Sequence, residues 1–336
     1  MDKTFDKILD LNNFQVSIIF LLIFVQIITV LLNIIVIIVM KRSHSRDVMN
    51  ASKRPNILMT TIAISRIILT TDFAFVFFVI IPIISWVSPN ISMIIESLIN
   101  YIIALSLYVI TFTMAVLSID QYYSLTRVFI NPLEKVSTNL LIKIILLSGS
   151  VLSFFQIFTR KVYYYDYGTH SIVCSYYENY LHKLSANKSF VIFCNMIMLI
   201  LQYIIPALII FVFSFRTIIY FLKKYFQKKE TGFELRIALR LFLIFLIFIA
   251  TNSAFHLFSI KNLIFKFSDE GQDGHDTCSF LSKNWLQYYL FLLSFTFHPI
   301  IYFCLNKVFW KMFYIHIVQQ WIDSRSKMVG TEVIEI

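Results

Sequence analysis

Hydrophobic residues gather into seven long stretches between residues 15 and 320, and short polar loops separate these stretches. An α-helix rises about 1.5 Å per residue, so about 18 or more apolar residues in a row can cross the hydrocarbon core of a bilayer. The pattern therefore predicts an all-α membrane protein with seven transmembrane helices. The predicted spans are 15–40, 56–84, 92–123, 139–160, 190–220, 236–262 and 283–305.

The amino-acid composition agrees with this pattern. Hydrophobic residues make up 58% of the chain and charged residues only 14%, and a soluble protein of this size could not bury so much apolar surface. The first span is predicted to be a retained helix, because it follows an acidic start and is too long for a cleaved signal peptide. No dinucleotide-binding, P-loop or zinc pattern occurs, so we expect no enzyme activity, no cofactor and no metal site.

The basic residues of the loops predict how the chain is oriented. The loops 41–54, 124–143, 221–240 and 306–336 hold most of the loop lysines and arginines, and loops of this kind face the cytoplasm. We therefore expect a multi-pass protein of the plasma membrane with its amino terminus outside. These loops account for the formal net charge of +10, and no nucleic-acid partner is expected.

This topology divides the chain into four regions. They are an extracellular amino terminus (1–14), a seven-helix bundle (15–305), a short amphipathic helix (306–317) and a cytoplasmic tail (318–336). In the amphipathic helix the aromatic side chains can lie in the membrane interface while the lysines face lipid phosphates. Membrane lipids are therefore expected partners.

The end of the seventh span is the strongest local signal in the chain. Pro299 follows His298 and interrupts the backbone hydrogen bonds, which permits a kink. Tyr302 lies one turn further on, near the predicted cytoplasmic face. A proline, a tyrosine and an interfacial helix in this order, after a seventh span, indicate a heptahelical receptor.

Arg66 lies in the middle of the second span. An arginine at that depth costs roughly 2.5–3.5 kcal/mol on insertion scales, so it is expected to face the bundle and to find acceptors there. Asn33 of the first span lies opposite on the predicted topology. We expect Arg66, Asn33 and the cytoplasmic half of span seven (His298, Pro299 and Tyr302) to form a polar network that changes partners on activation.

Several positions depart from the rhodopsin-like receptors, which the architecture otherwise resembles. Those receptors end span three in Asp-Arg-Tyr, and their arginine engages the G protein. This chain has Asp120-Gln121-Tyr122, so the arginine is missing. In span six, Asn252 and Ala254 occupy the places of the usual tryptophan and proline.

Other short segments resemble the bitter taste (type 2 taste) receptors. That family carries Leu-Ala-x-Ser-Arg in span two, Phe-Tyr-x-Leu-Lys after span three, Ala-Leu-Lys before span six and a histidine followed by an asparagine in span seven. The matching segments here are Ile62-Ala-Ile-Ser-Arg66, Tyr122-Tyr-Ser-Leu-Thr126, Ala238-Leu-Arg240, and His298 with Asn306. Thr126 in place of the lysine and Pro299 after the histidine depart from the family pattern.

The resemblance implies a chemosensory receptor that detects small organic agonists from outside and activates a heterotrimeric G protein of the gustducin-like or Gi type. Aligned on the span-six and span-seven motifs, the expected agonist contacts are Tyr108, Gln202, Asn252, Phe255, His256 and Tyr288. The expected coupling surface combines aromatic packing at the foot of span three with a basic field. Its residues are Gln121, Tyr122, Tyr123, Arg127, Lys223, Lys224, Arg236 and Arg240.

Two glycosylation sequons and two cysteines lie on the predicted outer side. Glycosylation sequons begin at Asn90 and Asn187, both on the predicted outer side. Cys174 and Cys278 lie in outer loops, where oxidising conditions permit a bridge, although two free thiols are an equal alternative.

The alternative functions are a rhodopsin-like peptide or pheromone-type receptor and, with less support, a transporter. Inverted repeats and broken helices are typical of transporters, and the sequence shows neither.

Overall fold

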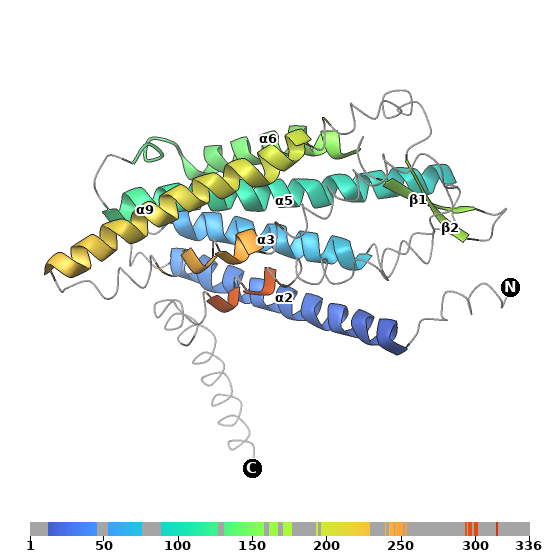
Figure 1. The fold of residues 1–336 in the computed structure, drawn as a ribbon, viewed down its shortest axis with the longest axis horizontal. Coiled ribbons are helices and arrows are strands. Elements are labelled where there is room, and N and C mark those ends of the chain that lie inside the picture. Colours follow the sequence, from blue (N-terminus) through green and yellow to red (C-terminus); the bar gives the residue numbers. More distant parts are fainter. Residues whose placement is uncertain are drawn as a thin grey trace, which may run out of the picture.

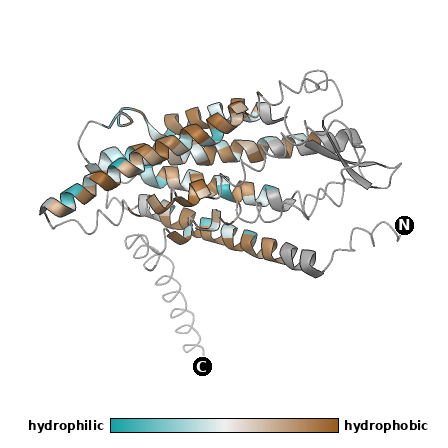
Figure 2. Ribbon diagram, viewed as in Figure 1, coloured by the Kyte–Doolittle hydropathy of each residue, from teal (hydrophilic) through white to brown (hydrophobic). Residues whose placement is uncertain are grey.

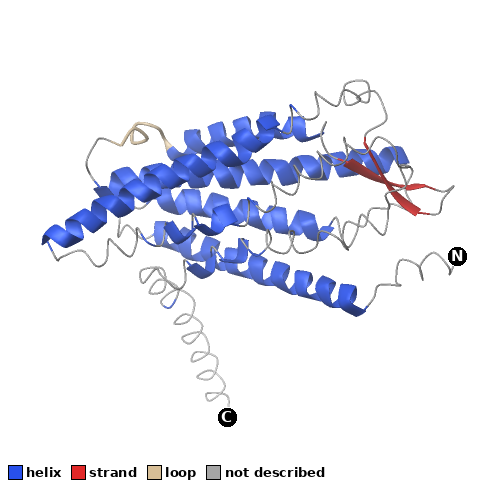
Figure 3. Ribbon diagram, in the orientation of Figure 1, coloured by secondary structure: helices blue, strands red, loops and turns tan. Residues whose placement is uncertain are grey.

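The computed structural model describes most of the first two-thirds of the chain. The described residues are 13–45, 53–75, 89–126, 131–157, 161–166, 171–176, 193, 196–228, 239, 242–244, 246–250, 253, 293, 295–297, 299–301 and 314. Nearly all of them are helical (Figure 3). The long helices are α2 (Asn13–Ser45), α3 (Lys53–Phe75), α5 (Pro89–Thr126), α6 (Thr138–Ile157) and α9 (Ile205–Lys228).

Three of these helical segments are long and apolar enough to cross a membrane. They are Phe20–Lys41 of α2, Ser97–Thr126 of α5 and Met196–Lys224, which contains most of α9. The segment Thr138–Phe154 of α6 is apolar but shorter. The structure therefore gives a mainly α-helical chain with three candidate membrane-spanning helices, and it agrees with the first, third and fifth predicted spans.

α5 lies at the centre of the described bundle. It packs against α3, α6 and α9, and α2 packs against the other side of α3 (Figure 1). The buried side chains of α5 recur at helical spacing, for example Leu107, Ile110, Met114 and Leu117. A helix that is buried on several sides needs apolar residues around most of its circumference, and the mainly apolar sequence of α5 supplies most of them (Figure 2).

α2 lies at the edge of the bundle and has a different pattern. Phe20, Phe24, Ile27 and Leu31 follow one another at helical spacing, and all four side chains are exposed. Exposed apolar stripes of this length are unusual on soluble proteins. They suit a helix whose outer face contacts lipid.

A β-hairpin follows α6, and the sequence pattern did not predict it. Strand β1 (Lys161–Asp166) pairs antiparallel with β2 (Ser171–Tyr176), with Tyr163 opposite Cys174. Both strands are rich in valine, isoleucine and tyrosine, which favour pleated structure. β1 contacts α5, so the hairpin lies at the end of the bundle where α5 begins (Figure 1).

The helix of the fifth predicted span widens just before a proline. Residues Ile200–Ile204 form the π-helical turn η4, in which the amide of Ile205 donates to the carbonyl of Ile200. Pro206 has no amide hydrogen, so the carbonyl of Gln202 loses its α-helical donor. Short π turns of this kind are frequent at functional sites, and this one carries the buried side chain of Gln202.

Candidate functional site

Among the described residues, a connected polar group lies where α3 begins and α5 ends, which we call the Arg54 end of the bundle. The Nη1 atom of Arg54 lies 3.2 Å from Oδ1 of Asp120 and forms an ion pair with it. The Arg54 side chain is 17% exposed and that of Asp120 only 5%. Hydrogen bonds between charged groups that are shielded from water contribute about 1.5–3 kcal/mol each, so this contact joins α3 firmly to α5.

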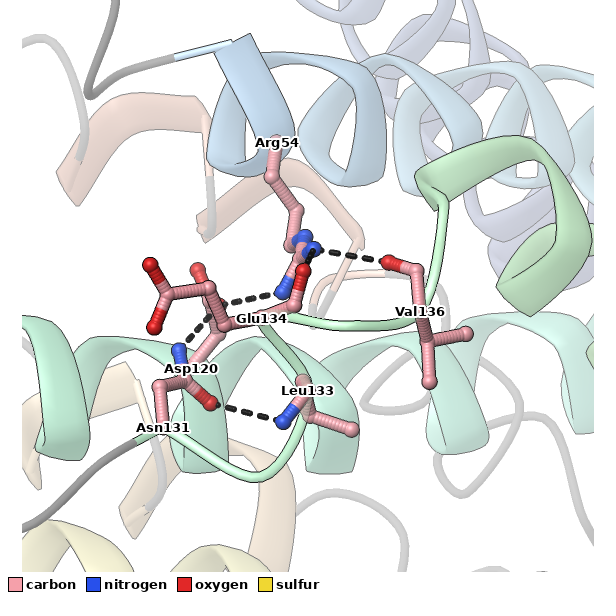
Figure 4. A network of polar contacts seen from close by, with 6 residues as sticks. All are labelled: Arg54, Asp120, Asn131, Leu133, Glu134 and Val136. Atoms are coloured by element: carbon pink, nitrogen blue, oxygen red, sulfur yellow. Dashed lines mark hydrogen bonds and ion pairs between the residues drawn. The ribbon is translucent and has the colours of Figure 1, made fainter.

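The same carboxylate also holds the segment between α5 and α6. Asn131 donates from Nδ2 to Oδ1 of Asp120 over 2.9 Å, and its own Oδ1 accepts the amide of Leu133. Arg54 donates from Nη2 to the carbonyl of Val136 over 2.8 Å. Residues 131–137 are thus fixed to both helices, as Figure 4 shows. We call this set, Arg54, Asp120, Asn131 and Val136, the Arg54 network.

An aromatic group lies beside the network on the α9 side of α5. The ring of Phe213 lies 5.5 Å from that of Tyr122 and 6.1 Å from that of Tyr123, and the two tyrosine rings are 5.1 Å apart. Edge-to-face contacts at such distances add about 0.5–1.5 kcal/mol beyond simple burial. Two of the predicted coupling residues, Tyr122 and Tyr123, therefore pack together against α9.

Further along α9, an apolar cluster lies on the same side of α5 as this aromatic group. Ile218 and Phe221 of α9 are buried, and Leu125 of α5, Tyr220 of α9 and Phe242 pack against them. Phe221 has no exposed surface at all. We call these five residues the Phe221 cluster, and it contains no charged group.

α9 continues past this cluster. Lys228, its last residue, follows Phe221 by seven positions, which corresponds to about 10 Å of helix. Lys223 and Phe226 in this extension are exposed, and hydrophilic residues mark its tip (Figure 2). The predicted coupling lysines Lys223 and Lys224 therefore lie at the Arg54 end, beyond the last described turn of α5.

The predicted activation network lies deeper in the bundle. Asn33 and Arg66 are both buried, on α2 and α3. Asn33 donates from Nδ2 to the carbonyl of Thr29, while Arg66 donates from Nη2 to the sulfur of Met114 on α5. Within the described part of the chain no hydrogen bond joins Arg66 directly to Asn33, so the structure gives these two residues separate neighbours.

The described residues near Pro299 contact α2 through a hydroxyl. Thr29 of α2 and Thr296 share a buried hydrogen bond, and Pro299 is buried and helical. This bond lies one turn before Asn33 on α2. His298 and Tyr302 lie outside the described residues.

Two of the predicted agonist contacts lie within the described chain. Tyr108 is fully buried on α5, and its hydroxyl has no hydrogen-bond partner. Its Cβ lies beside α6, because a Cβ placed on Gly149 would meet it at 3.4 Å. Gln202 is buried in η4, which contacts α5. Gln202 therefore lies near α5. Tyr108 belongs to α5, and its Cβ lies on the side of that helix that packs against α6.

The remaining predicted residues are distributed as follows. Asn90 lies in the first turn of α5, and Cys174 lies in β2. Gln121 lies next to Asp120, and its buried Oε1 atom has no hydrogen-bond partner. The predicted residues outside the described part of the chain are Arg127, Asn187, Arg236, Arg240, Asn252, Phe255, His256, Cys278 and Tyr288, together with 306–317 and 318–336 apart from Tyr314.

Arg54 is the functional candidate that the sequence analysis missed. In the sequence it is one of the basic residues of the predicted cytoplasmic loop 41–54. A signal for it existed, because Asp120 lies near the end of a predicted membrane span and is followed by Gln121, which carries no charge, and a buried carboxylate needs a cation.

Comparison with known proteins assigns no family. No protein-family model matches the chain, and a search of curated proteins finds no match.

Proposed function

We propose that this chain is a heptahelical, G-protein-coupled chemosensory receptor of the bitter taste type, with the Arg54 end facing the cytoplasm. The observation that carries the proposal is the arrangement at that end. A short loop is fixed to Asp120, and two tyrosines at the foot of α5 pack against a long helix with a basic tip. Such a surface suits a partner with an acidic face and an apolar helix.

In this proposal a small organic agonist enters from the hairpin end and packs near α5 and η4. It binds the active arrangement of the helices better than the inactive one, and only that difference shifts the population. The sixth span then separates from α5 at the Phe221 cluster. The opened cleft accepts the carboxyl-terminal helix of a Gα subunit, and no covalent chemistry is catalysed.

The first test is a response assay. Cells that express the full chain are exposed to panels of bitter compounds and of peptides, and calcium and cAMP are recorded. Responses to small bitter compounds support the proposal. Responses to basic peptides alone would favour a peptide receptor, and transport of a solute without any G-protein signal would contradict a receptor of either kind.

A second test concerns the missing arginine. Tyr123→Ala should abolish agonist-driven nucleotide exchange while agonist binding is retained, because the ring lies on the proposed Gα side of α5 and not among the agonist contacts. Gln121→Arg is the converse variant. If Gln121→Arg strongly raises coupling while Tyr123→Ala has no effect, the chain behaves as a rhodopsin-like receptor that has lost its arginine.

A further inference from the structure

Asp120 needs a cation that its own helix does not provide. Its side chain is almost fully buried, and a buried carboxylate without a positive partner is strongly destabilising. The next residue is Gln121, which carries no charge and whose Oε1 atom is itself without a hydrogen-bond partner. The cation therefore has to come from another element.

Arg54 supplies it from the first turn of α3. One terminal nitrogen of its guanidinium meets Asp120, and the other meets the carbonyl of Val136, with the carbonyl of Glu134 at 3.5 Å. Donating to a carboxylate and to a backbone carbonyl at the same time requires a planar group whose donors point in different fixed directions, and only arginine has such a side chain. A lysine could pair with the carboxylate, but it could not hold the loop carbonyl in the same geometry.

The contacts of Arg54 end in the backbone of the loop. Asn131 fixes the start of the segment on Asp120, and Val136 fixes its end on Arg54. Between them the amide of Glu134 donates to the carbonyl of Asn131, and the amide of Val136 donates to that of Leu133. The side chains of Pro132, Glu134 and Lys135 remain exposed, so the loop is rigid in its backbone and open to a partner.

The network does not reach the other side of α5. All the partners of Arg54 lie on α5 or in residues 131–137, and none of the described residues of α9 or of the sixth span takes part. The ion pair can therefore stay intact while that side opens. The ion pair therefore anchors residues 131–137 and is not a contact that breaks on activation.

We propose that Arg54 is a positioning residue of the docking surface, because it replaces from α3 the guanidinium that Gln121 lacks and fixes residues 131–137 for contact with a Gα subunit. This inference rests on the proposed function for its partner. The anchoring of the loop, however, is a property of the chain alone and can be measured without any partner.

The experiment uses the full chain, purified and reconstituted in lipid nanodiscs. Hydrogen exchange of peptides that cover 131–137 measures the anchoring. Basal nucleotide exchange on a purified Gi heterotrimer, titrated against that heterotrimer, measures docking. The variants are Arg54→Ala and Arg54→Lys, and Arg216→Ala is the control because Arg216 is an exposed arginine of α9.

We expect Arg54→Ala to speed amide exchange in 131–137 by about tenfold, which is the size of one lost charged hydrogen bond. The heterotrimer concentration for half-maximal exchange should rise by about the same factor, while the rate at saturation is kept, because the loop acts on binding. Arg54→Lys should fall between Arg54→Ala and the unchanged chain in both measurements. Arg216→Ala should leave amide exchange in 131–137 unchanged.

Different outcomes overturn different statements. Unchanged amide exchange in Arg54→Ala would show that Arg54 does not anchor the loop. Faster amide exchange with an unchanged heterotrimer titration would show that the loop is not a docking surface. If the unchanged chain activates no heterotrimer, the proposed function fails, and the amide exchange alone then decides whether Arg54 holds the loop. Should Arg54→Ala not reach the membrane, Arg54→Lys keeps the charge beside Asp120 but cannot hold the carbonyl of Val136 in the same geometry, and unchanged amide exchange in that variant would overturn the anchor.

Discussion

The two sides of α5 are held in different ways at the Arg54 end of the bundle. Towards α3 and residues 131–137 the contacts include an ion pair and hydrogen bonds of defined direction, centred on Asp120 and Arg54. Towards α9 and Phe242 the contacts of the Phe221 cluster are aromatic and aliphatic. Polar contacts are strong only in a narrow geometry, whereas apolar contacts have no preferred direction and can shift or separate by degrees.

This difference suggests which side can move. Parting α3 from α5 would leave a nearly buried carboxylate without its cation, which is strongly destabilising. Parting Phe242 from α5 at the Phe221 cluster separates mainly apolar side chains, and a partner helix with apolar side chains can restore the lost contacts. In the proposed receptor the Arg54 network is therefore the fixed frame and the Phe221 cluster is the gate.

The largest effect should follow removal of the Phe221 ring. Phe221→Ala deletes a fully buried side chain, and such changes cost about 3–5 kcal/mol of stability. Because only the closed arrangement uses this ring, the variant should also raise basal nucleotide exchange several-fold per receptor at the cell surface. Phe226→Ala, five residues further along α9 and 79% exposed, is the matched control. Equal basal rates of nucleotide exchange in the two variants would show that the Phe221 cluster does not hold the receptor closed.

A smaller effect is expected on the charged side. Asp120→Asn weakens the bonds to Arg54 and Asn131 and should lower the free energy of unfolding by about 1.5–3 kcal/mol. Thermal unfolding in detergent measures the loss, and Glu134→Gln is the control because its side chain is exposed. Agonist-independent signalling should not rise in Asp120→Asn. A rise as large as that of Phe221→Ala would make the network part of the gate.

The packing of α5 on α6 should tolerate added volume poorly. A Cβ at Gly149 would lie 3.2 Å from Cδ1 of Leu105 and 3.4 Å from Cβ of Tyr108. Gly149→Leu should therefore cost on the order of 1 kcal/mol or more, seen as a lower unfolding temperature. Val151→Leu adds a larger side chain at an exposed site of the same helix and should be neutral. A neutral Gly149→Leu would mean that this side of α5 is less rigid than its contacts suggest.

The smallest effect concerns the exposed basic tip of α9. Lys223→Gln should slow association with a Gi heterotrimer by about twofold at low salt, and the difference should vanish as salt screens the charge. Stopped-flow association at two ionic strengths measures it. A change in dissociation that persists at high salt would instead make Lys223 a direct contact on the moving side.

Part of the site could be predicted from the sequence because its signals are local. The arginine within span two and the aromatic pair at the foot of span three follow from residue type and position in an apolar helix. Structure places Arg66 in the interior and brings Tyr122 and Tyr123 against Phe213. The direct pairing of Arg66 with Asn33 was not found among the described contacts, since it depends on how α2 and α3 are rotated about their axes.

The long apolar helices, their order and the buried arginine were determined by the sequence itself, because hydrophobic length and the cost of a charge in an apolar medium act on each segment separately. Tertiary structure decided which charges meet. Arg54 and Asp120 are 66 positions apart, and nothing in either segment specifies the other. The same holds for Leu125, Phe221 and Phe242, because apolar residues are common in every span and only the packing of the helices selects which of them touch.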